Sequence, residues 1–161
     1  AGDHVTTITV LEMLREWTLK NGDLTDKRLL DLGTGTGILA IAGYLYGIGS
    51  VTAADIEESA VFAAEKNFSL NGMAGKADII LGGIRDAGRG YDVIAANLFL
   101  EPLLDALAAA AKALNPKGAI IISGLLSGQE RDVFKAAEES GLRLIKKTEK
   151  AGWVSAVLEG R

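Results

Sequence analysis

Three closely spaced glycines and a nearby acid are the residues best suited to hold a charged ligand. Gly33, Gly35 and Gly37 follow an apolar segment that contains Asp31. Glycine allows the backbone to turn tightly and to approach a ligand closely, and a helix that begins after the loop presents free N–H groups. The spacing predicts a cofactor-binding loop that also includes Thr34.

A second acid lies where such a cofactor would place its ribose. Asp55 follows Gly37 by 18 residues and ends another apolar segment. A carboxylate at this spacing can accept hydrogen bonds from both hydroxyls of an adenosine ribose. Its other interpretation is a helix N-cap before Glu57, and the two roles are compatible. We expect Ile56 to line the same site.

Asp31 distinguishes between cofactors. A dinucleotide fingerprint fits from Gly35 to Ala40, so the spacing alone does not exclude NAD. A carboxylate beside a pyrophosphate would repel it, whereas the amino group of S-adenosylmethionine would be attracted. The sequence therefore favours S-adenosylmethionine, with S-adenosylhomocysteine as the product, and a nicotinamide oxidoreductase is a distant alternative.

Asn97 is the candidate for the reacting end of the site. Methyl transfer from a sulfonium is an in-line displacement that needs positioning, and a side-chain carbonyl can hold the N–H groups of an amine. The alternative is that Asn97 only caps a turn. His4, the sole histidine, could relay a proton from the amine or pack on the cofactor. We expect Leu98, Phe99 and Glu101 to line the entrance.

The elements that must position these residues alternate between strand and helix. Apolar periodicity and Gly, Pro and Asn stop signals predict five strands, at 28–32, 50–56, 77–81, 91–97 and 119–125. They predict helices from Thr6 or Thr7 to about 20, then at 38–47, 57–70 and 101–114, and from a capping box at Ser127 to about 140.

The last twenty residues read differently. "LRLIKKTEK" and "GWVSAVLEG" look like two strands joined by a tight turn at Ala151-Gly152. Together with the alternating elements, they predict an α/β fold with a doubly wound, Rossmann-like, seven-stranded sheet. The sheet should be mostly parallel, with a C-terminal antiparallel hairpin.

Composition excludes several classes. The chain has 161 residues, 48% of them hydrophobic, a net charge of −4 and no cysteine. There is therefore no disulfide or thiolate chemistry, no strong signal for nucleic-acid binding and no apolar run long enough for a membrane span. We expect a cytoplasmic protein, monomeric by default and without a metal site.

Several segments carry a family resemblance. "LLDLGTGTGILAIA", "AADI" and the terminal hairpin resemble class I S-adenosylmethionine-dependent methyltransferases. Within these, "HVTT", "ANLFLEPL", "ISGLL" and "GWVSAVL" look like the PrmA family, the methyltransferases of large-subunit ribosomal protein eleven. The resemblance runs nearly end to end. It implies methyl transfer to a protein amine, either a lysine side chain or an α-amino group.

The resemblance also implies roles for individual residues. Thr6 and Thr7 match paired threonines that approach the bound cofactor, and Gly33 with its neighbours matches the methionine-side loop. Asp55 matches the ribose acid, and Asn97 matches the asparagine that faces the transferable methyl.

One departure concerns adenine. The acid expected after the third predicted strand, which would meet the adenine amino group, is replaced by Gly83, next to Ile84. A backbone carbonyl or Asp86 could substitute for it. We expect Gly83 and Ile84 to border the adenine.

A second departure concerns the acceptor. The family has a separate N-terminal domain that holds the ribosomal protein, and nothing in this sequence corresponds to it. We therefore expect 1–161 to be a single methyltransferase domain, the catalytic part only, without a substrate-recruiting domain. The alternatives are methylation of a small-molecule amine, or a cofactor-binding or partner-docking subunit without catalysis.

Overall fold

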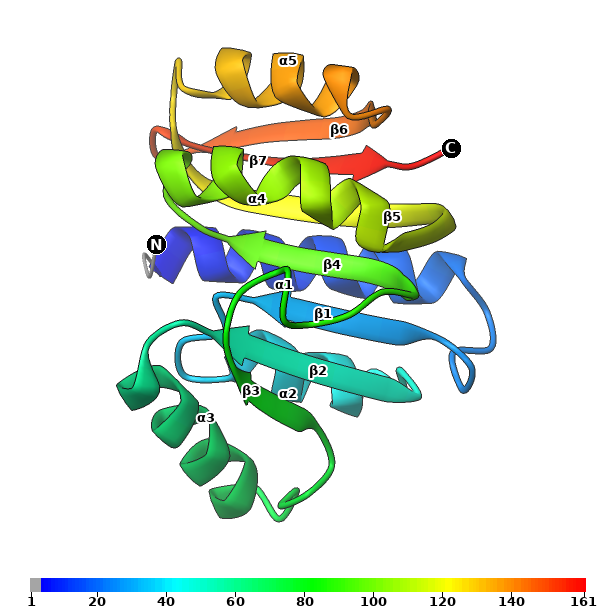
Figure 1. The fold of residues 1–161 in the computed structure, drawn as a ribbon, viewed down its shortest axis with the longest axis vertical. Helices are drawn as coiled ribbons and strands as arrows, with labels where there is room; N and C mark the ends of the chain where they lie inside the picture. Colours follow the sequence, from blue (N-terminus) through cyan, green and yellow to red (C-terminus); the bar gives the residue numbers. More distant parts are fainter. Residues whose placement is uncertain (1–3) are drawn as a thin grey trace.

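One mixed sheet with helices on both faces forms the protein (Figure 1). The computed structural model describes residues 4–161. The strands are β1 Arg28–Leu32, β2 Ser50–Asp55, β3 Asp78–Leu81, β4 Tyr91–Asn97, β5 Leu114–Leu126, β6 Arg143–Lys150 and β7 Trp153–Glu159. The helices are α1 His4–Lys20, α2 Ile38–Leu45, α3 Glu58–Leu70, α4 Leu100–Ala113 and α5 Glu130–Glu139.

The strand order is β3-β2-β1-β4-β5-β7-β6. β1 to β5 pair in parallel, and β7 pairs antiparallel with both β5 and β6. The predicted α/β fold class and its terminal hairpin are confirmed. Ala151 and Gly152 both have positive φ, of 52° and 81°, as the tight turn of a hairpin requires.

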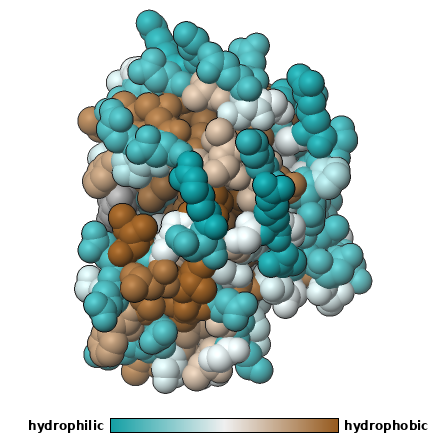
Figure 2. Space-filling view, in the orientation of Figure 1, coloured by the Kyte–Doolittle hydropathy of each residue, from teal (hydrophilic) through white to brown (hydrophobic). Residues whose placement is uncertain are grey.

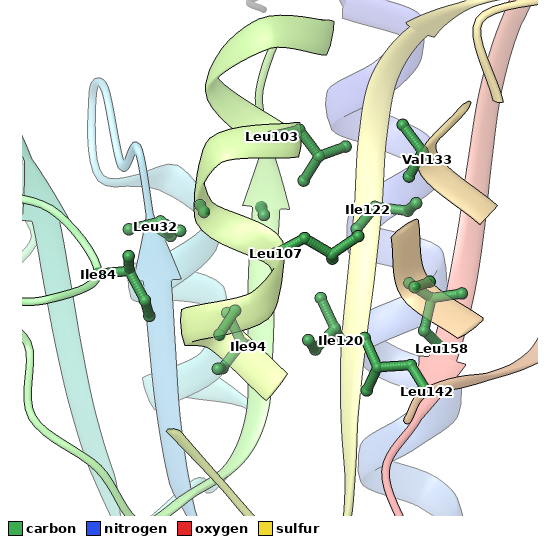
Figure 3. Packing of buried hydrophobic residues seen from close by; sticks show 14 of the residues in the cluster. Leu32, Ile84, Ile94, Leu103, Leu107, Ile120, Ile122, Val133, Leu142 and Leu158 are labelled. Atoms are coloured by element: carbon green, nitrogen blue, oxygen red, sulfur yellow. The ribbon is translucent and has the colours of Figure 1, made fainter. Parts of the chain in front are cut away.

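Both faces of the central strands are buried, which explains their nearly continuous apolar runs. Ile94 and Ala96 of β4 face the cluster built by α4 and α5, whereas Val93 and Ala95 face the cluster built by α1, α2 and α3. Figure 3 shows Leu107 of α4 directed toward β5 in the first cluster. The surface of the α4 and α5 side alternates apolar patches with long charged side chains (Figure 2).

Two expectations at helix starts are corrected. α1 begins at His4, so Thr6 and Thr7 lie inside its first turns and do not cap it. α5 begins at Glu130 without a side-chain cap, and the Ser127 hydroxyl instead donates to Glu149 at 2.9 Å. The predicted capping box is wrong because Glu130 accepts from the Gly128 amide and is used within the connecting turn.

The spacing of apolar residues predicts a buried stripe on α1 that includes Ile8 and Leu14, and the structure agrees with it only in part. Thr6, Val10, Met13 and Leu14 are buried, but Ile8 is 42% exposed. The sheet covers a face rotated from the apolar stripe and takes in threonines, whose methyl groups pack well. The residues at 115–118, "NPKG", predict a turn between the helix at 101–114 and the strand at 119–125. The structure instead includes them in β5, where they form a bulge in the pairing with β4.

α1 lies against the C-terminal half of the sheet, where it contacts β5 and β7. Two ion pairs join it to β6: Lys146 to Glu16 at 2.9 Å and Lys150 to Glu12 at 3.3 Å. The first and last elements of the described chain are therefore neighbours. Within residues 4–161, no helix has the length and apolarity needed to cross a membrane.

Candidate active site

A cleft of about 630 Å³ lies at the carboxyl ends of the central parallel strands. From β1 the sheet extends through β2 and β3 on one side and through β4 and β5 on the other, so the strand order reverses between β1 and β4. Ligands of such sheets bind beyond the carboxyl ends of the strands at this point. The lining residues are Thr7, Leu32, Gly33, Thr34, Gly35, Thr36, Ile38, Leu39, Asp55, Ile56, Gly82, Gly83, Ile84, Arg85, Asn97, Leu98, Pro102, Asp105 and Ala106.

The glycine loop forms one wall. Gly33, Gly35 and Gly37 have φ of 72°, 57° and 86°, which a side chain would strain. The amides of Gly33 and Thr34 both donate to the Ala54 carbonyl, at 2.8 and 3.0 Å, so the loop is folded onto β2. Gly33 and Gly35 line the cleft, whereas Gly37 starts α2 and packs on α3.

Asp55 ties this loop to the end of β2. Its Oδ2 atom accepts from the Gly35 amide at 3.0 Å, and its Oδ1 atom accepts from the Glu57 amide at 2.9 Å. The carboxylate therefore holds the glycine turn and the entry to α3 together, and it also lines the cleft. Each oxygen keeps a lone pair that a ligand hydroxyl can use.

Asp31 lies beneath the loop and is fully buried. Its Oδ2 atom accepts from the Thr34 hydroxyl at 2.6 Å, and its Oδ1 atom accepts no hydrogen bond of normal geometry from the described residues. Burial raises the pKa of Asp31 to about 6, although Thr34 and the Ala40 backbone partly counter it. The structure thus places this acid behind Thr34 and outside the cleft lining.

Asn97 ends β4 at the floor of the cleft. Its Nδ2 atom donates to the Thr6 hydroxyl of α1 at 3.4 Å, and its Oδ1 atom is buried without a hydrogen bond from the described residues. The amide of Leu98 donates to the Ser123 carbonyl at 3.1 Å, which fixes the turn after the strand.

These unpartnered oxygens test whether the expected cofactor and acceptor fit. A buried polar atom without a partner costs free energy, so native structures keep one mainly where a ligand or water will satisfy it. Asp31 Oδ1 is a buried acid oxygen beneath the loop, and Asn97 Oδ1 is a buried neutral acceptor on a residue that lines the cleft. Both suit groups that bear N–H, as an amino acid moiety and an amine acceptor do.

The region expected to face adenine is open. A Cβ at Gly83 would meet only the Ile56 side chain, at 4.0 Å, and Ile84 lies beside it in the cleft. Asp86, the expected substitute for the missing acid, accepts from the Gly83 amide at 2.9 Å and does not line the cleft. Its carboxylate stabilises the turn after β3 by accepting this hydrogen bond.

The structure does not bring every predicted residue to the cleft. His4, Phe99 and Glu101 are exposed and do not line it, and Thr6 does not line it either but bonds to Asn97, which does. Their predicted roles remain predictions.

Other cleft residues were not foreseen. Arg85 and Asp105 line the cleft although no sequence motif marked them, and Pro102 lines it although its motif gave it no role in the site. Pro102 and Asp105 are three residues apart, and this helical spacing on α4 is the one signal that could have found them. Among residues 4–161, no group of three or more metal-ligating side chains gathers.

Comparison with known proteins identifies relatives. A family model described as "Ribosomal protein L11 methyltransferase (PrmA)" matches residues 1–160. Proteins named ribosomal protein L11 methyltransferase from Pelotomaculum thermopropionicum and Dictyoglomus thermophilum are both 33% identical, over 96% and 98% of this chain. The chain spans about half the length of these relatives, 49% and 50%.

Solved structures agree with the fold. A ribosomal protein L11 methylase from Lactobacillus delbrueckii subsp. bulgaricus is 29% identical with a TM-score of 0.87, and the match covers 100% of this chain and 82% of that one. A magnesium protoporphyrin IX methyltransferase from Synechocystis, solved with bound SAH, has a TM-score of 0.76 at 18% identity, covering 96% and 82%. The latter supports the fold alone.

Proposed function

Because the chain belongs to the ribosomal protein L11 methyltransferase (PrmA) family, we propose that it transfers a methyl group from S-adenosylmethionine to an amine of a protein. The acceptor is a lysine side chain or an α-amino group, and ribosomal protein L11 is the first candidate. In this proposal 1–161 form the catalytic unit. The observation that carries the proposal is that Asn97, which lines the cleft, has a buried Oδ1 atom without a hydrogen-bond partner among the described residues.

The cofactor occupies the cleft from the glycine loop toward β3. The loop at 33–35 holds the methionine moiety, and Asp55, which already orders that loop, accepts the ribose hydroxyls. Asp31 contributes a negative charge beneath the methionine amino group. The open apolar wall at Ile56, Gly83 and Ile84 receives the adenine.

The cofactor, when bound, supplies an electrophilic methyl group on a sulfonium. The residues of the chain position the nucleophile. Asn97 Oδ1 accepts an N–H of the neutral amine and so directs the nitrogen lone pair into the cleft. Leu98, fixed by its bond to Ser123, limits access of water from the side of α4. No strong base is needed, because the amine arrives neutral and its surplus proton leaves to solvent after transfer.

Calorimetry with three ligands tests the class of cofactor. We expect S-adenosylmethionine and S-adenosylhomocysteine to bind and NAD not to bind. Absence of S-adenosylmethionine binding would refute the proposal.

Transfer of labelled methyl tests the acceptor. Purified bacterial ribosomal protein L11 and a cell lysate, split into protein and small-molecule fractions, serve as acceptors. We expect label in protein, recovered as N-methylated lysine or α-amine after hydrolysis. Label confined to small molecules supports the small-amine alternative. No label despite cofactor binding supports a docking subunit.

Asn97→Ala tests the reacting end. Because positioning is lost while the cofactor walls remain, kcat should fall about 100-fold with cofactor Kd within twofold of the parent. Equal kcat in the two proteins would remove Asn97 from the mechanism.

A further inference from the structure

One contact joins the candidate reacting end to the first helix. The Nδ2 atom of Asn97, at the end of β4, donates to the Thr6 hydroxyl of α1 at 3.4 Å. Thr6 is fully buried. Among the hydrogen bonds of residues 4–161, this is the one made by the Asn97 side chain.

The two ends of an asparagine amide have similar shape but opposite hydrogen-bonding character. In the structure Nδ2 donates to the Thr6 hydroxyl, and Oδ1 has no hydrogen-bond partner among the described residues. Because a hydroxyl can donate as well as accept, this contact fixes the position of the amide group, and the observed orientation is the one that leaves Oδ1 for the acceptor amine. A rotated amide would present N–H donors to the amine and would compete for the lone pair that must attack. The bond to Leu98 fixes only the backbone, so the amide orientation depends on a side-chain contact.

We propose that Thr6 is a positioning residue that holds the Asn97 amide with Oδ1 available to the acceptor amine. This inference rests on the proposed function. It differs from the role suggested by the family resemblance, a direct approach of Thr6 to the cofactor. The placement of the paired threonines supports the difference, because Thr7 lines the cleft and Thr6 does not.

The first test is a measurement on the protein without cofactor or acceptor. The side-chain amide signals of Asn97 in a ¹⁵N-labelled sample are assigned by their loss in Asn97→Asp. Thr6→Val keeps the shape of the side chain and removes the hydroxyl, so exchange of these amide protons with solvent should become about three- to tenfold faster. Thr6→Ser should restore slow exchange.

Thr9→Val is the matched control. Thr9 lies one turn further along the same buried face, and its hydroxyl donates to the Val5 carbonyl of the same helix at 2.9 Å. This variant should leave the Asn97 signals in place. If Thr6→Val does not fold, as judged by circular dichroism, Thr6→Ala repeats the test.

The second test is a double-mutant cycle on methyl transfer with saturating cofactor. Thr6→Val should lower kcat about three- to tenfold with cofactor Kd unchanged, Thr6→Ser should restore kcat, and Thr9→Val should retain it. In an Asn97→Ala background, Thr6→Val should have no further effect.

The outcomes separate the inference from the proposed function. Unchanged Asn97 amide signals in Thr6→Val overturn the positioning role, as does a raised cofactor Kd with unchanged kcat. If the parent protein transfers no methyl group, the proposed function fails, and the exchange measurement alone decides whether Thr6 orients the amide.

Discussion

Asp31 and Asp55 lie at the ends of adjacent parallel strands, but their surroundings differ in almost every respect. Asp55 is partly exposed, lines the cleft and accepts two backbone N–H groups. Asp31 is fully buried, has one hydroxyl partner and keeps one oxygen without a hydrogen bond of normal geometry. Both oxygens of Asp55 therefore accept hydrogen bonds within the fold, whereas one oxygen of Asp31 has no such bond from the described residues.

The comparison shows that two acids near one ligand site can contribute in different ways, one by accepting hydrogen bonds and the other by its buried charge. Asp55 already accepts two backbone N–H groups, and its oxygens can accept further hydrogen bonds from a ligand. Asp31 carries a desolvation penalty, seen in a pKa raised to about 6, that a cationic ligand would relieve. Substitutions at the two positions should therefore affect stability and affinity in different combinations.

Asp55→Ala should have the largest effect. It removes two charge-assisted bonds that shape the glycine turn as well as the ribose acceptor, so cofactor Kd should rise about 100-fold. Asp55→Asn, which keeps one acceptor oxygen, should cost less, about tenfold. Isothermal calorimetry measures both. A Kd within threefold of the parent in Asp55→Ala would remove Asp55 from the binding site.

Asp31→Asn should weaken binding and stabilise the free protein. Cofactor Kd should rise about 30-fold, because the negative charge beneath the methionine amino group is lost. Without the buried charge, the free energy of unfolding at pH 7 should increase by about 1 to 3 kcal/mol. Urea unfolding and calorimetry are the measurements. A variant less stable than the parent would show that the buried charge of Asp31 does not destabilise the free protein.

The pH should affect the stability of the free parent protein and its affinity for the cofactor in opposite directions, because both depend on the charge of Asp31. The folded pKa of Asp31, about 6, lies above its ordinary value of 3.8, so the folded protein takes up this proton first. The penalty is complete above pH 6 and disappears as the pH falls toward 4. The stability advantage of Asp31→Asn over the parent should therefore shrink between pH 7 and pH 5.

The affinity of the parent protein for the cofactor should decrease as the pH falls. Binding that needs the ionised carboxylate should weaken about tenfold between pH 7 and pH 5 in the parent. Asp31→Asn should lack this dependence. The same pH slope in both proteins would assign the titration to another group.

Thr34→Val should have the smallest effect. It removes the hydroxyl that lowers the pKa of Asp31, so the pKa should rise further and cofactor Kd should increase about threefold at pH 7. Thr34→Ser keeps the hydroxyl and should bind as the parent does. An unchanged pH profile in Thr34→Val would show that Asp31 does not depend on this contact.

The sequence predicted the fold class and β1 residue for residue, because strands buried on both faces leave unbroken apolar runs between glycine turns. It also predicted that the glycine loop and Asp55 share a site. Burial of Asp31 and its bond to Thr34 depend on how closely α2 covers β1, which periodicity does not specify. Arg85 and Asp105 reach the cleft only because the loop after β3 and α4 fold over it.

Errors at element ends had a common cause. Ser127 and Glu130 match a capping box, but the turn after β5 uses both side chains for other partners. The segment at 115–118 contains turn residues, and β5 absorbs it as a bulge. A local motif indicates which hydrogen bonds a segment can form, and the tertiary contacts determine which of them it does form.

The position of α1 has a consequence for the order in which the chain can fold. During synthesis, the first helix emerges long before β5 and β7, the strands that cover its buried face. Until residue 159 has been made, Val10 and Met13 lack part of their cover, and Glu12 and Glu16 lack their lysine partners. Contacts so distant in sequence slow folding. Loss of the last hairpin would therefore expose the buried face of α1 to proteolysis or to a chaperone.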